Sequence, residues 1–187
     1  MKFYPFAVLL GGLTSISFGQ EGPAVPGASI SLETLASRSG TREVWAEEVG
    51  RLDSGKNSAA FTVLAIEDPT RTGQQIRGLR LALSVPEGTR TLHIAEAMLQ
   101  PLKEKLDGLA MAARAWSGRD HGYGMISTVC PGEEVRLPLS FGYHYRHGAK
   151  PELSLGGPDL PELVFPGPTL SQLLDIFGKA IQTLRLR

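Results

Sequence analysis

Alternation of apolar and polar residues is clearest near the middle of the chain. Across Gln75–Val85 a leucine or valine recurs at every second position from Leu79, which is typical of a strand with one buried face. Residues 59–66 are apolar at both sets of alternate positions, so they predict a strand covered on both sides. Residues 44–49 are a third strand candidate. Short turn clusters separate these runs, and the order predicts an antiparallel meander.

A second alternating run lies in the C-terminal half, over residues 135–145. Pro138 has no amide hydrogen to donate to a ladder, so the run predicts an edge strand or a strand with a bulge. Residues 125–129 predict a strand before it, and residues 151–155 predict its hairpin partner. Residues 156–168 are rich in Pro and Gly and predict a connector.

Two segments have helical periodicity. After a turn at residues 86–88, apolar residues recur at spacings of four and three between positions 95 and 116, which predicts a helix with a continuous seam. Pro101 lies inside it, so either the helix is kinked or a second helix begins there. The seam packs against the sheet or, alternatively, against a second chain in a homodimer. The last helix is predicted to begin at Thr169, which forms a capping box with Gln172.

The order of these elements indicates an α+β fold, with antiparallel sheet structure and two amphipathic helices packed on one face. Several strands followed by a helix occur twice, over residues 43–116 and 124–187. This suggests two β-rich halves that each end in a helix. The two halves share the order of their elements but no residue-level sequence repeat. Whether one half is a duplication of the other therefore stays open.

The N-terminal residues have the order of a secretory signal. Lys2 precedes an apolar stretch over residues 3–13, and Ser17 and Gly19 supply the small residues that a signal peptidase reads. We therefore expect residues 1–19 to be removed. A membrane anchor is the alternative, but the stretch is shorter than the roughly 20 apolar residues that span a bilayer. The expected product is secreted or periplasmic, with no stable membrane span.

Composition limits the remaining choices. Residues 20–42 are dense in Pro, Gly, Ser and Thr and predict a flexible linker, whereas residues 43–187 suit a single α+β domain. The chain has 19 Lys and Arg against 19 Asp and Glu, which argues against a nucleic-acid partner. The single cysteine, Cys130, cannot form an internal disulfide, so packing must hold the fold. Cys130 is a buried apolar residue, a partner in an intermolecular disulfide or a reactive thiol.

Candidate binding residues form one polar strip and one loop. The strip comprises Arg136, Ser140, His144 and Arg146, which share one face of the run over residues 135–145 and its end. Such donors suit a carboxylate or an acidic glycan, although a water-facing sheet surface has the same composition. His121 follows Asp120 in a Gly-flanked loop, and the two have the residue types of an acid–base pair.

No motif for a nucleotide, a metal or another cofactor occurs in the sequence, and we expect none to be bound. His144 and His147 are three residues apart, a spacing that separates them on an extended strand. The sequence thus favours an exported, non-enzymatic binding or structural module whose partner is an unidentified protein or a small anionic ligand. The alternative is a small exported hydrolase or ligand-binding enzyme that uses the Asp120–His121 loop or the polar strip.

Overall fold

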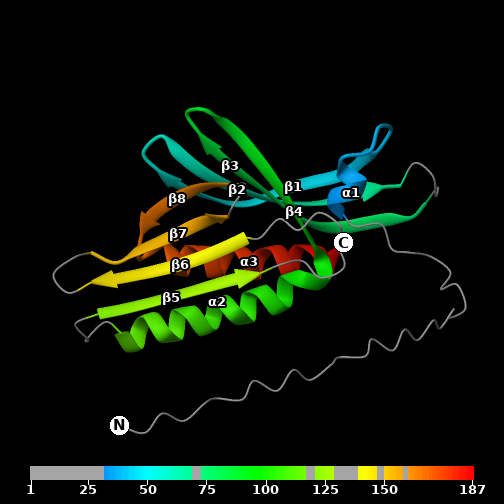
Figure 1. Ribbon diagram of the computed structural model, residues 1–187. Coiled ribbons are helices and arrows are strands. Elements are labelled where there is room, and N and C mark those ends of the chain that lie inside the picture. The colour runs from blue at the N-terminus through cyan, green and yellow to red at the C-terminus, as the bar shows by residue number, and fades with distance from the viewer. Residues whose placement is uncertain (1–31, 69–72, 117–120, 129–138, 147–149, 158–159) are drawn as a thin grey trace, which may run out of the picture.

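The structure, a computed structural model, describes six stretches of the chain. They are residues 32–68, 73–116, 121–128, 139–146, 150–157 and 160–187. Along them the chain forms helix α1, strands β1 to β4, helix α2, strands β5 to β8 and helix α3 (Figure 1). The expected α+β class is confirmed, with antiparallel pairing throughout the described strands.

The first sheet is a meander whose described strands lie in the order β1-β2-β3-β4. The strands are β1 (Arg42–Ser54), β2 (Asn57–Glu67), β3 (Gln75–Val85) and β4 (Gly88–Ala95). The first three include the predicted strands. The fourth corrects the sequence analysis, which placed no strand between the turn at residues 86–88 and the helix. The apolar pattern of β4 is short, because only Leu92 and Ile94 are buried on its inner face.

The second sheet repeats the meander in the order β5-β6-β7-β8, again for the described strands. They are β5 (His121–Thr128), β6 (Leu139–Arg146), β7 (Glu152–Gly157) and β8 (Leu160–Pro166). The predicted β6–β7 hairpin is confirmed. Of the two alternatives predicted for this run, the edge strand is wrong, because β6 pairs with β5 on one side and β7 on the other. β8 occupies part of the expected connector, and Pro138 lies outside the described residues.

Two long helices complete the halves. α2 (Glu96–Trp116) runs through Pro101 as one helix, so no second helix begins there. α3 (Thr169–Leu186) begins at the predicted residue, but no side chain caps its N-terminus and the predicted capping box is wrong. Instead, the hydroxyl of Ser171 donates to the carbonyl oxygen of Pro168 at 2.9 Å. The seam of α2 faces the interior, with Leu99, Leu102, Leu106 and Leu109 buried.

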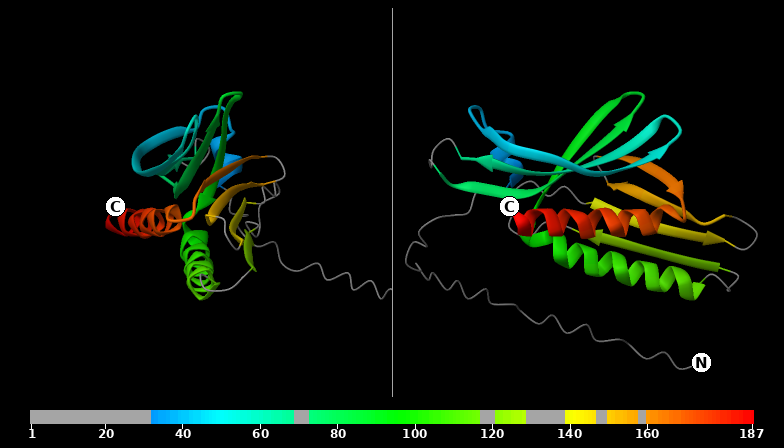
Figure 2. Two further views of the ribbon diagram at one scale, coloured as in Figure 1. Left: turned by 90° about the vertical axis from the view of Figure 1, so that its left-hand side faces the viewer. Right: turned by 180° about the vertical axis from the view of Figure 1, so that it is seen from behind.

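Each long helix packs on the sheet of the other half. α3 lies against β1 and β2, whereas α2 lies along β5 and β6, and the two helices contact each other. Seen end-on, the two sheets and the two helices surround one interior (Figure 2). Phe177 of α3 stands at its centre, edge-to-face with Phe61 of β2 at 6.1 Å and with Phe141 of β6 at 6.2 Å between ring centroids. The two halves therefore share one hydrophobic core.

The outer face of the first sheet is covered at one end by α1 (Leu32–Ala36). This helix lies in the segment expected to be a linker, and Leu32 and Leu35 are fully buried against Leu64 and Ile66 of β2. The side chain of Leu32 occupies the space that a Cβ at Gly78 would need. Over residues 63–66 both faces of β2 are thus covered, as the apolar sequence predicted, whereas Ala60 and Thr62 on the outer face stay partly exposed.

Candidate functional site

The predicted polar strip lies on the second sheet. On β6, Phe141 is buried in the core, and alternate residues of a strand point to opposite faces. Ser140, Gly142 and His144 therefore lie on the face turned away from the core. We call the part of this face formed by β5, β6 and β7 the outer face of the second sheet.

A hydrogen bond joins the centre of this face across two strands. The Nε2 atom of His144 is 3.2 Å from the hydroxyl oxygen of Ser154, whose residue is only 8% exposed. Ser154 pairs with Gly142 in the ladder. A Cβ at Gly142 would collide with the Ser154 hydroxyl and would lie 3.2 Å from His144 Nε2. The absence of a side chain at Gly142 leaves the room for this bond.

The register of β5 and β6 brings together two residues that the sequence analysis treated separately. His121 pairs with Arg146, and Tyr123 pairs with His144. His121 is the first residue of a strand, which corrects its expected place in a loop. On the other side of β6, His144 pairs with Glu152, an exposed acidic residue. The backbone positions of two histidines, one arginine and one glutamate are therefore neighbours in the ladder. They are His121, His144, Arg146 and Glu152.

Part of the predicted chemistry lies outside the described residues. This applies to Arg136, Asp120, Cys130 and His147. Gly142 lies on the face that strand alternation predicts for it, whereas Ser154 of β7 is a residue of this face that the sequence did not predict. No spacing in the sequence signals Ser154, since it approaches His144 only through the pairing of β6 with β7.

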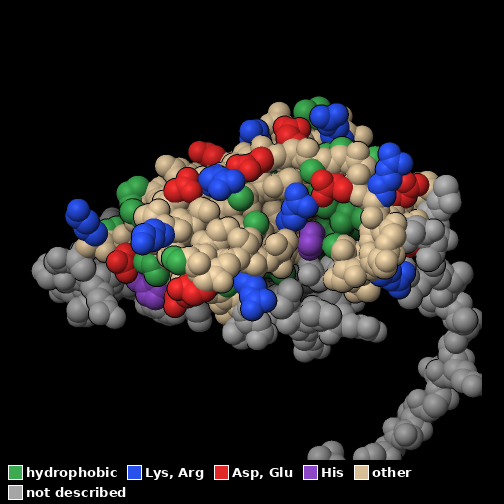
Figure 3. All heavy atoms as spheres, turned by 90° about the horizontal axis from the view of Figure 1, so that it is seen from above, with side chains coloured by type: hydrophobic (Ala, Val, Ile, Leu, Met, Phe, Trp, Pro, Cys, Tyr) green, Lys and Arg blue, Asp and Glu red, His purple; other side chains and the backbone are tan. Residues whose placement is uncertain are grey.

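The outer face of the first sheet carries a different polar surface. One row crosses its four described strands, with Thr62 paired to Glu48 and Arg80, and Arg80 paired to His93. Arg80 forms an ion pair with Glu43 at 2.8 Å. Viewed over this sheet, acidic and basic side chains are interspersed rather than gathered by sign (Figure 3). The surface has no large field of one charge with which to attract a polyanion.

The same sheet also has an exposed ion pair on β1. The hydrogen bond that Arg51 donates to Glu48 raises the pKa of that guanidinium above its usual value. Since both groups are about half exposed, solvent screens the pair and it adds little to stability.

The hollows on the described surface include two that are described by their lining residues. One, of about 570 Å³, lies between the β3–β4 hairpin and the start of β8. The other, of about 190 Å³, lies between the N-terminal turn of α2 and the end of α3. Neither is lined by a described histidine.

Neither metal-binding nor membrane-spanning features are found among the described residues. No group of three or more His, Cys, Asp or Glu side chains there is arranged to hold a metal ion. α2 and α3 lack the hydropathy of a bilayer span, and α1 has only five residues. Neither the known protein-family models nor the curated proteins include a match to this chain.

Proposed function

We propose that the protein is exported and acts as a non-enzymatic binding module, with an anionic ligand held on the outer face of the second sheet. The observation that carries this proposal is the β5–β6 register, which places His121 opposite Arg146 and next to the Tyr123–His144 pair. Guanidinium, imidazolium and hydroxyl groups all donate hydrogen bonds to a carboxylate. A sheet face with such donors along neighbouring strands suits an extended ligand such as an acidic glycan.

The His144–Ser154 hydrogen bond supports this use of the face. It holds the imidazole in one position across β6 and β7, so less side-chain freedom is lost when a ligand binds. Glu152 lies opposite His144 and would repel an anion that extends towards β7. The ligand is therefore expected to lie over β5 and β6.

Titration of the exported protein with an oligogalacturonate at low salt tests the proposal. We expect Arg146→Gln to weaken binding by about threefold to tenfold, because a charge-assisted hydrogen bond is lost. Arg51→Gln on the first sheet is the matched control and should bind as the parent does. Equal affinities for the two variants, or no heat of binding with the parent protein, would contradict the anion site.

Export is tested separately. Residues 1–19 have the order of a signal sequence, so the form recovered outside the cytoplasm of an exporting bacterial host should begin at Gln20. Intact-mass spectrometry of the periplasmic fraction and the medium measures this directly. Recovery of the exported form with Met1 still attached would overturn cleavage.

One observation favours the second candidate, a small exported hydrolase. His144 Nε2 and Ser154 Oγ are within reach of proton transfer, as a base and a nucleophile must be. Ser154 lies inside a strand that pairs on both sides and is nearly buried, which hinders attack on a substrate. Labelling of the parent protein, but not of Ser154→Ala, by a fluorophosphonate probe would favour the hydrolase over the binding module.

A further inference from the structure

The larger hollow lies where the two sheets meet. Its lining residues come from the β3–β4 hairpin on one side and from the first residues of β8 on the other, and Figure 1 shows this hairpin above β8. Its volume of about 570 Å³ is within the usual range of small-molecule sites. It is formed by the first sheet and β8, whereas the proposed anion site lies over β5 and β6.

The floor of the hollow is apolar. Val85 and Leu160 are partly buried and pack against the main core, and Pro161 continues this surface on β8. Hydrocarbon placed on these side chains would be removed from water, which favours binding. The floor therefore suits an aliphatic group.

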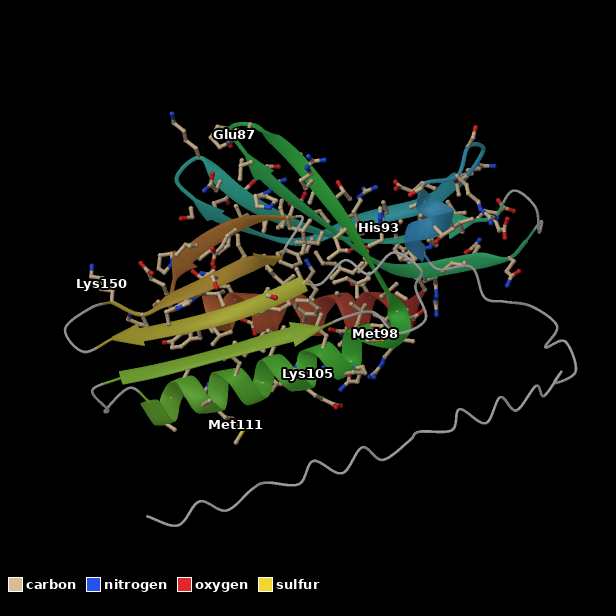
Figure 4. All side chains as sticks on the ribbon, viewed as in Figure 1. Glu87, His93, Met98, Lys105, Met111 and Lys150 are labelled. Atoms are coloured by element: carbon tan, nitrogen blue, oxygen red, sulfur yellow. The ribbon has the colours of Figure 1, made fainter. Side chains whose placement is uncertain are left out.

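The rim carries one charge of each sign. Glu87 stands at the tip of the hairpin, as Figure 4 shows, and Arg90 follows on β4. Both residues are exposed, and within the described stretches neither forms an ion pair. Thr89 lies between them and shares a hydrogen bond of 2.9 Å with Ser84. An anion alone would be attracted by Arg90 and repelled by Glu87.

We propose that this hollow binds a small zwitterion with aliphatic side chains, of the class of a free dipeptide. Its carboxylate would accept hydrogen bonds from Arg90, its ammonium group would donate to Glu87, and its side chains would cover Val85 and Leu160. Both rim charges are then used, and the apolar floor supplies the remaining contact.

Titration of the ¹⁵N-labelled exported protein with leucyl-leucine tests this site. Chemical-shift changes are expected at the amides of Val85, Gly88 and Leu160. Glu87→Gln and Arg90→Gln should each weaken binding by about threefold, as expected for a partly exposed ion pair. Asp175→Asn and Lys179→Gln, at exposed positions of α3, are the matched controls and should leave the affinity unchanged.

Two modified ligands separate the roles of the rim charges. Leucyl-leucine amide lacks the carboxylate, so Arg90→Gln should no longer weaken its binding. N-acetyl-leucyl-leucine lacks the ammonium group, and Glu87→Gln should then strengthen binding by removing a repulsion. If Glu87→Gln instead strengthens the binding of unmodified leucyl-leucine, or if no shifts appear around the hollow at millimolar peptide, the proposal is overturned.

Discussion

Arg77 of β3 holds Glu96, the first residue of α2, through two contacts, with Nε 3.0 Å from one carboxylate oxygen and Nη2 3.1 Å from the other. The same guanidinium donates to the carbonyl oxygen of Leu184 at 3.0 Å, near the end of α3. Arg77 thus places a cation at the negative end of one helix, and Glu96 places an anion at the positive end of the other. One side chain links the first sheet to both long helices.

Arg77→Gln should therefore destabilise the fold by about 1 kcal/mol, a value reduced for solvent screening because both side chains are about a third exposed. Urea denaturation measures the change in the free energy of unfolding. Arg51→Gln breaks a more exposed ion pair on β1 and should change this free energy much less. Equal losses in the two variants would contradict a special role for Arg77.

Gly142→Ala should destabilise the protein by about 1–3 kcal/mol, because the new methyl group overlaps the hydroxyl of Ser154. The imidazole signals of His144 should also move in NMR spectra as its hydrogen bond is lost. Adding Ser154→Ala removes the overlap, so the double variant should be more stable than the sum of the two single changes implies. Strict additivity would show that the two residues do not touch.

Gly108→Ala should have the opposite effect. Gly108 is on the exposed side of α2, and nothing beyond its own helix lies within 4 Å of the new methyl group. The better helix propensity of alanine should raise the free energy of unfolding by roughly 1 kcal/mol. Thermal denaturation followed by circular dichroism suffices to measure it, and a lower midpoint than the parent's would contradict the open environment.

Phe177→Ala should be the most damaging of these changes, with a loss of about 3–5 kcal/mol, because it leaves a cavity between the two sheets. Since Phe61 and Phe141 lose the same partner, the two halves should weaken together. Hydrogen exchange of β2 and β6 amides reports on each sheet separately. Faster exchange in β6 alone would contradict a core shared by the two halves.

Local patterns predicted most of the strands and helices. The alternation in β3 and the seam of α2 are strong because each includes several consecutive turns of its period at which leucines are buried on one face. The sequence pattern does not predict β4 and β8, because each has few buried positions and lies beside turn residues. The capping box failed because a short motif shows only that a hydrogen bond could form. In the structure Pro168 precedes the helix, and no side-chain cap is made.

The candidate site was harder to predict. Strand periodicity alone predicts that Ser140 and His144 share one face, because that periodicity is a property of the extended backbone. The meeting of His121 with Arg146, and of His144 with Ser154, depends on which strands pair and in what register. Register follows from the whole core, since a shift of one residue would turn every buried side chain of a strand outward.

The sequence by itself determined the α+β class, the position of most elements and the buried side of the two long helices, because these follow from the local periods of the backbone. Only the tertiary structure decided that α2 covers the second sheet and α3 the first, and that Phe177 joins the two sheets. It also decided that Arg77 bridges the ends of two helices and that Glu87 and Arg90 share the rim of one hollow. These relationships either join residues that are far apart in the chain or depend on how the two halves pack. No local pattern in the sequence encodes such contacts.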